Sequence, residues 1–293
     1  FMEKPVAVDA PGVRKVLAAA AEAKKKNLKV GVGLQRHHDA RYIETVQRLH
    51  DGALGDINFL RAYWNSSGVW VQQRQPQMTE MEYQMRNWYY FNWLCGDHIV
   101  EQHIHNLDVA NWVKRAPPVH AQGMGGRQVR TGVEFGEIYD HHAVEFTYAD
   151  GSTLMSHSRH QADTWSSVSE HAHGDKGSCD ISAASIELKD GSKWRSRADS
   201  GDPYQVEHDE LFRAIREDRP YDEAEYGAAS TMTAILGRMA TYGGKPLSYA
   251  EALQSELSTW PAAGELSWTT EPPTAPDAEG RYPIPMPGRT RVV

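Results

Sequence analysis

The chain has 293 residues, of which 40% are hydrophobic and 24% are charged, and its formal charge is -8. This composition is typical of a globular protein with one large domain or two ordinary ones. Lys and Arg form no basic stripe, which argues against a nucleic-acid partner. No apolar run is long enough to cross a bilayer, and two cysteines are too few for a disulfide framework or a cysteine zinc site.

The N-terminal segment has the pattern of a strand, a helix and a second strand. Residues 1–2 are apolar, and the next three, Glu3-Lys4-Pro5, turn the chain. Asp9 is a suitable N-cap for the alanine-rich helix that follows. The stretch LKVGVGL, residues 28–34, then has the apolar content of a strand. Since two strands joined through a helix usually run parallel, the pattern predicts a βαβ unit.

Two glycine-rich stretches have part of the pattern of the dinucleotide-binding fingerprint. GVGLQR, residues 31–36, begins like G-x-G-x-x-G, but Arg36 occupies the position of the third glycine. GMGGRQ, from Gly123, is followed by no helix pattern. We therefore predict no dinucleotide fingerprint within the chain, and we expect one, if the protein has it, upstream of residue 1.

A helix, a strand and a long loop are expected between residues 39 and 92. The helix runs from Asp39 to Asp51, and GALGDINFLRAYW, residues 52–64, then turns and enters a strand. Residues 66–92 are rich in Gln, Trp and Tyr, and we interpret them as a surface or active-site loop. The apolar side of the helix consists of Tyr42, Ile43, Val46 and Leu49.

Strands dominate residues 119–188. Asp150-Gly151 and Asp190-Gly191 are typical of hairpin turns between alternating runs, so this part predicts a mostly antiparallel sheet. Two helices are expected next, at residues 205–218 and 226–243. The last 25 residues contain six prolines and predict an extended arm over the surface.

Residues 93–113, WLCGDHIVEQHIHNLDVANWV, crowd many titratable groups into one stretch. A helix over residues 97–113, turning about 100° per residue, places four of them on one face and apolar residues on the other. These four are Asp97, Glu101, His105 and Asp108. His98 adjoins His105, whereas His103 points away from this face and is expected to be a packing or surface residue.

Three interpretations of this face are open. In the first interpretation the face is solvated and carries Glu–His pairs. In the second it is a metal site of His98, Glu101 and His105, whose ligand types suit zinc or iron. In the third interpretation His105 moves a proton, and Glu101 orients it and raises its pKa. The stretch lacks the usual His-x-x-x-His pair, and we predict no metal ligands. Flanking Trp and Tyr residues favour a partly dry pocket and therefore the acid–base site.

Two motifs together make the sequence resemble the Gfo/Idh/MocA family of NAD(P)-dependent oxidoreductases. The Rossmann half of that family typically carries Glu-Lys-Pro, which is Glu3-Lys4-Pro5 here. Its second domain carries a helix of the form Asp-x-Gly-x-His-x-x-Asp, which corresponds to residues 101–108. Glu101 stands where the family usually has Asp, and His103 where it usually has Gly. LGDINFL, from Leu54, also looks like the family's entry into its second domain.

The resemblance implies an α/β fold with an α+β second domain. The tail of a Rossmann-type parallel sheet would be followed by an open, mainly antiparallel sheet packed on helices. Residues 1–50 would be the C-terminal remnant of the Rossmann dinucleotide-binding domain, residues 51–268 the substrate and oligomerisation domain, and residues 269–293 a proline-rich tail. The family's Gly-rich loop would then precede residue 1, and the activity of this chain alone is left open.

The resemblance also implies hydride transfer between a sugar or polyol carbinol and NAD or NADP. His105 would be the base, Lys4 would bond the same oxygen beside the nicotinamide, and Glu101 would orient His105. The segment Glu3-Lys4-Pro5 would contact the cofactor. His157 and His160 alternate with Arg159 on a strand, so only one side of that set can face the site. The candidates for binding substrate hydroxyls are Asp97, His98, Arg36 and Arg159.

Other functions stay open beside the dehydrogenase. An NAD-recycling lyase or glycosidase would act through a keto-sugar intermediate, and a non-catalytic sugar-binding or oligomerisation module would need no cofactor. A metal-dependent isomerase would lose its activity to a chelator. The expected partners are a carbohydrate and further copies of the chain in a homodimer or homotetramer, with no nucleic acid and no membrane. The compartment is open: cytoplasmic, or periplasmic if an upstream export signal was removed.

Overall fold

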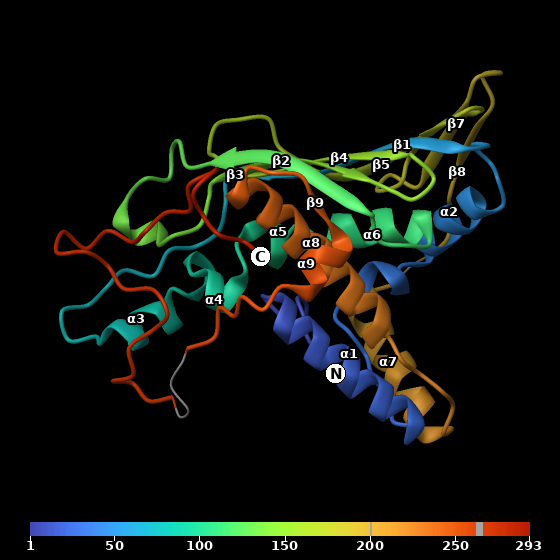
Figure 1. Ribbon diagram of the computed structural model, residues 1–293. Coiled ribbons are helices and arrows are strands. Elements are labelled where there is room, and N and C mark those ends of the chain that lie inside the picture. The colour runs from blue at the N-terminus through green and yellow to red at the C-terminus, as the bar shows by residue number, and fades with distance from the viewer. Residues whose placement is uncertain (200, 262–265) are drawn as a thin grey trace.

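A nine-stranded sheet lies over a layer of helices in the computed structural model of the chain, which describes residues 1–199, 201–261 and 266–293 (Figure 1). The strand order is β8-β7-β6-β5-β1-β4-β3-β2-β9. The central strand β1 pairs parallel with β4, and the other neighbouring pairs are antiparallel. The predicted open, mainly antiparallel sheet is therefore confirmed. The strands are β1 Ile57–Ser66, β2 His120–Gly126, β3 His141–Thr147, β4 Thr153–His160, β5 Ser167–Gly174, β6 Gly177–Asp180, β7 Ser185–Leu188, β8 Lys193–Arg195 and β9 Leu247–Ser248.

The two predicted hairpin turns join β3 to β4 and β7 to β8. Their glycines, Gly151 and Gly191, have φ angles of +83° and +87°, a conformation that L side chains rarely adopt. Nothing lies within 4 Å of a Cβ built at either position, so the backbone conformation alone favours glycine there. These turns fix the register of the strands on both sides.

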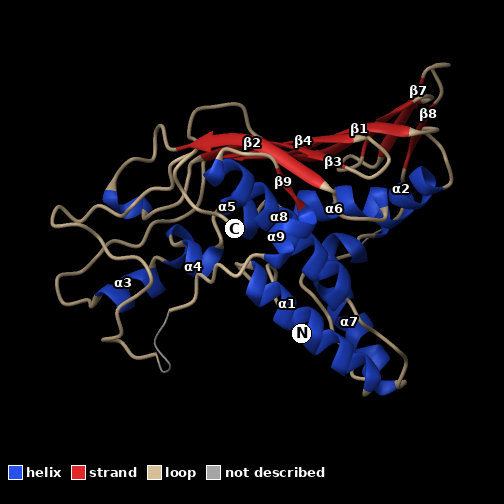
Figure 2. Cartoon of the chain, viewed as in Figure 1, coloured by secondary structure: helices blue, strands red, loops and turns tan. Residues whose placement is uncertain are grey.

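The helices cover one face of the sheet, and the other face is bare of helices in the described part of the chain (Figure 2). The long helix α8 lies in the middle of the helical layer, where it contacts β2 and β3 on one side and α1 on the other. One apolar core extends from α1 and α2 through α6 and α8 to the sheet. The helices are α1 Ala10–Lys25, α2 Ala40–His50, α3 Glu80–Arg86, α4 Asn92–Cys95, α5 His98–Glu101, α6 Ile104–Lys114, α7 Pro203–Arg216, α8 Ala224–Gly243 and α9 Tyr249–Gln254.

The N-terminal segment keeps the predicted parallel order but forms no long strands. Asp9 caps α1 by accepting a hydrogen bond from the backbone N–H of Gly12 at 2.8 Å. Met2 and Val32 form one isolated parallel bridge, and Val30 forms another with Asp222. The βαβ interpretation was therefore right in direction, although the expected strand at residues 28–34 is reduced to these bridges.

The predicted continuous helix over residues 97–113 is wrong. The chain forms α5 and α6 instead, and Gln102 and His103 lie between them. The backbone N–H of His103 bonds to the carbonyl of His98, five residues back, which interrupts the helical hydrogen-bond ladder. The His103 ring is buried and bonds Ser156 Oγ on β4 at 2.7 Å, which ties the break to the sheet.

The ionisable face predicted for that helix is not solvated. Asp97, Glu101, His105 and Asp108 are all at least nine-tenths buried, and the apolar side is buried as well. A solvated polar face is therefore excluded. Every one of these polar groups needs a partner or a ligand in the interior.

Smaller expectations also need correction. Tyr42, Val46 and Leu49 of α2 are buried as predicted, but Ile43 is exposed. The loop at residues 66–92 contains α3, and several of its aromatic residues form a second buried cluster with Trp93 and Tyr282. α8 begins at Ala224, two residues before the predicted start, and ends at Gly243 as predicted, with Gly244 as its left-handed cap.

The proline-rich tail follows the predicted extended course. Residues 269–293 contain no helix or strand, and they cross the ends of α4 and α8 (Figure 1). Tyr139 donates its hydroxyl to the carbonyl of Pro285 at 2.9 Å, which holds the tail in place. Among the described residues, no helix combines the length and the apolar character needed to cross a membrane.

Candidate active site

Lys4 and Glu101 meet in the fold although they are far apart in the sequence. Lys4 Nζ donates to Glu101 Oε1 at 2.8 Å and to the Glu101 carbonyl at 2.5 Å. The two side chains are only 14% and 12% exposed, so water screens the pair incompletely. The Glu-Lys-Pro segment and the motif at residues 101–108 thus converge on one point, as the resemblance implied.

His105 lies beside this pair, near the start of α6. Its side chain is almost fully buried, and its ring stacks on that of Trp64 on β1, with the centroids 6.0 Å apart and the planes inclined by 26°. Burial lowers the pKa of His105 well below its ordinary value, and the positive charges of Arg36 and Lys4 lower it further. The imidazole is therefore neutral at neutral pH and can accept a proton.

Glu101 does not orient His105, contrary to the sequence prediction. One carboxylate oxygen of Glu101 binds Lys4, and the other, Oε2, is buried without a hydrogen-bond partner, as is His105 Nδ1. The reason is the break at Gln102 and His103, because a spacing of four places two side chains on one face only within a continuous helix. Two buried polar atoms without partners mark a place where a hydroxylated ligand could bind.

Arg36 is engaged within the protein rather than open to a substrate. Its Nη1 donates to Glu170 Oε1 at 2.6 Å, and the Glu170 carboxylate also accepts from Tyr42 Oη at 3.0 Å and Asn106 Nδ2 at 2.5 Å. Burial opposes the charge on Arg36, but the carboxylate of Glu170 outweighs it and raises the pKa of Arg36. This network joins α6, through Asn106, to the sheet directly beside His105.

Asp97 and His98 belong to a different place from Lys4 and Glu101. Both are fully buried at the start of α5, where they lie against His142 of β3 and His160 of β4. They are therefore not in a position to bind substrate hydroxyls beside Lys4, as the sequence predicted. The short helix α5 separates the two places, since Asp97 caps its start and Glu101 is its last residue.

Arg159 lies on the bare face of the sheet. Along β4 the side chains alternate, with His160 buried toward the helices and His157 and Arg159 on the opposite side. Arg159 Nη2 donates to the carbonyl of Trp165 at 2.6 Å. The structure thus does not bring Arg159 together with His105, because the sheet stands between them.

Sequence reasoning missed Trp64 and Glu170, both on the helix-facing side of the sheet. The alternation of β1 places Trp64 on the same side as the buried Leu60 and Ala62. The partner strand β5 places Glu170 on that side as well, where it meets Arg36. Strand periodicity could have assigned Trp64 to the inner face, but only the three-dimensional pairing reveals that His105 lies over it.

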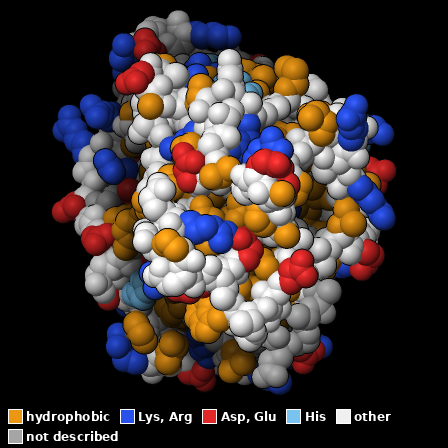
Figure 3. Space-filling model, turned by 90° about the vertical axis from the view of Figure 1, so that its left-hand side faces the viewer, with side chains coloured by type: hydrophobic (Ala, Val, Ile, Leu, Met, Phe, Trp, Pro, Cys, Tyr) orange, Lys and Arg blue, Asp and Glu red, His pale blue; other side chains and the backbone are white. Residues whose placement is uncertain are grey.

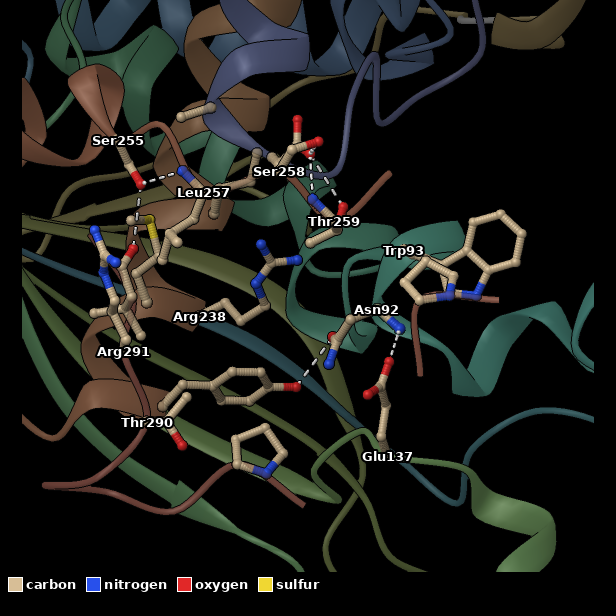
Figure 4. A pocket seen from close by; sticks show the side chains of 18 of the residues that line it. Asn92, Trp93, Glu137, Arg238, Ser255, Leu257, Ser258, Thr259, Thr290 and Arg291 are labelled. Carbon is tan, nitrogen blue, oxygen red and sulfur yellow. Dashed lines mark hydrogen bonds between the residues drawn. The ribbon is translucent and has the colours of Figure 1, made fainter. Parts of the chain in front are cut away.

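A cavity of about 310 Å³ lies apart from Lys4, Glu101 and His105 (Figure 4). It is formed by α4, α8 and the C-terminal tail, and it includes Asn92, Glu137 and Arg238. The backbone N–H of Asn92 donates to Glu137 Oε1 at 2.8 Å, and Arg238 donates to two backbone carbonyls, so these polar groups already have protein partners. On the face that Figure 3 shows, charges of both signs are mixed with hydrophobic side chains among the described residues.

Comparisons with known proteins agree with this fold. Residues 42–180 match the GFO/IDH/MocA C-terminal domain. Over 178 residues the chain is 24% identical to inositol 2-dehydrogenase of Rhizobium meliloti (strain 1021), which is 60% of this chain and 48% of that protein. The chain thus aligns with about half the length of this relative.

Solved structures of oxidoreductases share the fold at low sequence identity. Aldose-aldose oxidoreductase from Caulobacter crescentus, complexed with glycerol, superposes with a TM-score of 0.67 at 19% identity, covering 84% of this chain and 71% of that one. Levoglucosan dehydrogenase, in complex with NADH and levoglucosan, superposes with a TM-score of 0.65 at 13% identity, covering 85% and 73%. Residues 42–180 thus carry the GFO/IDH/MocA C-terminal domain, and the fold shared with these oxidoreductase structures agrees with that match.

Proposed function

We propose that this chain supplies the substrate half of a nicotinamide-dependent oxidoreductase that oxidises a carbinol of a sugar or polyol. The observation that carries this proposal is the contact of Lys4 with Glu101 beside a neutral, buried His105. The named relatives act on inositol, aldoses and levoglucosan, which supports a polyhydroxylated substrate.

The residues present fit a nicotinamide cofactor, NAD or NADP, next to Lys4. An ammonium group has three N–H donors, and Lys4 uses two of them on Glu101, so one is left for a ligand. Glu101 Oε2 and His105 Nδ1 are both buried without a hydrogen-bond partner. The segment Glu3-Lys4-Pro5 would contact the cofactor, which, when bound, accepts the hydride from the substrate carbon.

The remaining chemistry is a proton transfer that this chain's own residues can perform. Oxidation of a carbinol releases a hydride from carbon and a proton from the hydroxyl. His105 accepts that proton, since its imidazole is neutral. The third N–H of Lys4 donates to the same oxygen and stabilises the negative charge that develops on it. Glu101 positions Lys4 rather than His105.

The test is steady-state oxidation of a panel of polyols by the full-length protein, followed by the absorbance of the reduced nicotinamide. We expect His105→Ala and Lys4→Met each to lower kcat by about 10²- to 10⁴-fold, the usual contribution of a positioned acid or base. His157→Ala, on the bare face of the sheet, is the matched control and should keep its activity. Equal activity of His105→Ala and the control would remove His105 from the reaction.

The same assay separates the alternatives. A lyase or glycosidase that recycles NAD would cleave a glycoside without net change in nicotinamide absorbance, yet would still need His105 and Lys4. Failure of the full-length protein to bind either NADH or NADPH in calorimetry would exclude both hydride-transfer functions and leave the non-catalytic module. Calorimetry on this chain alone, with the same nucleotides, shows how much of the cofactor affinity its residues provide.

We further propose that copies of the chain associate through the bare face of the sheet. Phe59, Tyr63, His157 and His171 stand on this face, and they are only partly exposed. Tyr63 packs edge-on against the exposed Trp165, with the ring centroids 5.4 Å apart. An aromatic face without a helical cover is suited to a second copy. Sedimentation of the wild type and of Tyr63→Glu tests this, because a charge at the centre of the face should shift the protein toward monomer.

A further inference from the structure

A cluster of one carboxylate and three imidazoles lies in the interior between α5 and the sheet. Asp97 and His98 come from the start of α5, and His142 and His160 come from β3 and β4. His142 is 2% exposed and the other three are 0% exposed. The ring of His98 lies 4.3 Å from that of His160 and 4.9 Å from that of His142, measured between centroids.

Most of the imidazole nitrogens in this cluster have no hydrogen-bond partner. Both nitrogens of His98 and both nitrogens of His160 are buried without a hydrogen-bond partner, whereas Nε2 of His142 lies 3.2 Å from Asp97 Oδ2. Leaving a buried polar group unpaired costs about 1–3 kcal/mol each. Four such atoms in one cluster are more than a folded interior normally contains, so the cluster calls for a ligand.

The two ring nitrogens of His142 face a hydroxyl and a carboxylate. Nδ1 lies 2.9 Å from Thr241 Oγ1, whose hydroxyl is also in position to donate to the carbonyls of Gly237 and Arg238 at 3.2 and 2.9 Å. Nε2 lies 3.2 Å from Asp97 Oδ2. In the tautomer with its proton on Nδ1, the Nε2 lone pair faces this carboxylate, and a cation between the two would stabilise that arrangement.

The carboxylate of Asp97 is fixed for this purpose. Its Oδ2 accepts from the backbone N–H of Tyr139 at 2.9 Å and from the Tyr242 hydroxyl at 2.5 Å. Its Oδ1 lies 3.8 Å from His98 Nε2. Neighbours that hold a metal ligand in place are the usual surroundings of a protein metal site.

We propose that Asp97, His98 and His142 bind one divalent transition-metal ion of the zinc type. One ligand atom of each residue lies within 4.8 Å of the other two. Ligands at zinc bond lengths of about 2.0–2.1 Å are about 3.4 Å apart in a tetrahedron. Asp97 and His142 are already at that spacing, with 3.2 Å between Oδ2 and Nε2, and no separation in the group would need to shorten by more than about 1.4 Å. Two imidazoles and a carboxylate suit zinc, iron(II) or cobalt(II), whereas magnesium and calcium prefer oxygen ligands.

This site is separate from the one that would transfer hydride. The sequence grouped His98 with Glu101 and His105 and predicted no metal ligands, whereas the fold groups it with Asp97 and His142. The ion would be structural, since the ligands are buried. It would hold the start of α5 against β3, and the last residue of that helix is Glu101, the partner of Lys4.

The test is metal binding by the whole chain after treatment with a chelator, with folding checked by circular dichroism. We expect one zinc ion per chain by calorimetry and elemental analysis, and a cobalt(II) visible spectrum typical of nitrogen and oxygen ligands. His142→Gln and Asp97→Asn should weaken zinc binding by at least about 100-fold, because even groups behind a ligand contribute 10- to 100-fold. His171→Gln, on the bare face of the sheet, should bind like the wild type.

Two results would overturn the proposal. One is a folded, chelator-treated wild type that binds neither zinc nor cobalt, with nitrogen NMR showing both nitrogens of His142 protonated, because a proton then bridges His142 and Asp97. The other is unchanged zinc binding in His142→Gln together with a loss in His171→Gln, which would place the ion on the bare face. If His142→Gln does not fold, X-ray absorption of the cobalt-loaded wild type decides, since the proposal requires two imidazoles and a carboxylate around the metal.

Discussion

Replacing Arg36 with Met tests whether this residue is part of the scaffold or of the substrate site. The substitution keeps most of the side-chain volume and removes the charge that pairs with Glu170. The side chains of Arg36 and Glu170 are 12% and 2% exposed, so the substitution leaves an uncompensated carboxylate in the interior. Breaking a buried ion pair from one side costs about 3–5 kcal/mol.

The structure places the expected loss at the lower end of that range. The carboxylate of Glu170 keeps its hydrogen bonds from Tyr42 and Asn106, which partly compensate the lost cation. We therefore expect Arg36→Met to lower the free energy of unfolding by about 3 kcal/mol, or the Tm by about 6–12 °C for a domain near this size. Arg86→Met, which breaks an exposed pair with Glu82, is the matched control and should cost less than about 1 kcal/mol.

The dependence of this loss on pH identifies its cause. Burial raises the pKa of Glu170, and Arg36 opposes that rise, so the pKa rises further in Arg36→Met. When a carboxyl group has a higher pKa in the folded than in the unfolded state, the protein loses stability as the pH rises from the lower pKa to the higher one. The loss of unfolding free energy caused by Arg36→Met should therefore shrink in acidic buffer. It should largely disappear in the double variant that carries Glu170→Gln as well. A deficit independent of pH, or an unchanged Tm with a raised KM, would refute the buried-charge argument and return Arg36 to the substrate site.

Three further predictions concern single positions away from the candidate active site. Gly136→Ala should destabilise the protein by about 3 kcal/mol or more in urea unfolding, because φ is +53° and a Cβ would lie 2.1 Å from the carbonyl oxygen of Tyr90. Burial opposes the charge of His38, but hydrogen bonds to the carboxylates of Glu223 and Glu210 outweigh it and raise the pKa of His38. His38→Gln should therefore cost more stability below about pH 6.5 than in alkaline buffer. An equal cost at both pH values would contradict this reasoning. Burial raises the pKa of Glu137 from its ordinary 4.5 to about 7. The wild type should therefore lose stability as the pH rises from about 4.5 to about 7. Thermal melts of Glu137→Gln over the same pH range should lack this loss.

Local patterns were sufficient for most of the fold. The N-cap at Asp9, the helix after Asp39 and the two Asp-Gly hairpins all follow from interactions within a few residues, and the structure confirms them. The parallel order of the N-terminal segment also follows from a local rule about connections. The exposed Ile43 shows the limit of such reasoning, because periodicity predicts a face but does not show how far the neighbouring elements cover it.

The candidate site could be predicted only in part, because its geometry depends on contacts between distant segments. The motifs identified Lys4, Glu101 and His105, and the first two do touch. The sequence could not supply the break at His103, where the buried ring bonds Ser156, a residue 53 positions away on the sheet. Because the sequence-based prediction assumed a continuous helix, it paired Glu101 with His105 and gave Lys4 no partner within the protein.

The same break determines why two sites lie so close together in one short stretch. A continuous helix would have directed Asp97, Glu101 and His105 to one side, so that a metal and a hydride site would compete for the same residues. Because α5 ends at Glu101, Asp97 and His98 at its start face His142 on the sheet. Glu101 at its end faces Lys4, and His105 lies in the next helix, α6. The titratable crowding in residues 93–113 is thus explained by two separate groups of partners. His103→Ala removes the bond to Ser156 that holds this break against the sheet. We therefore expect it to disturb zinc binding and the Lys4–Glu101 contact together.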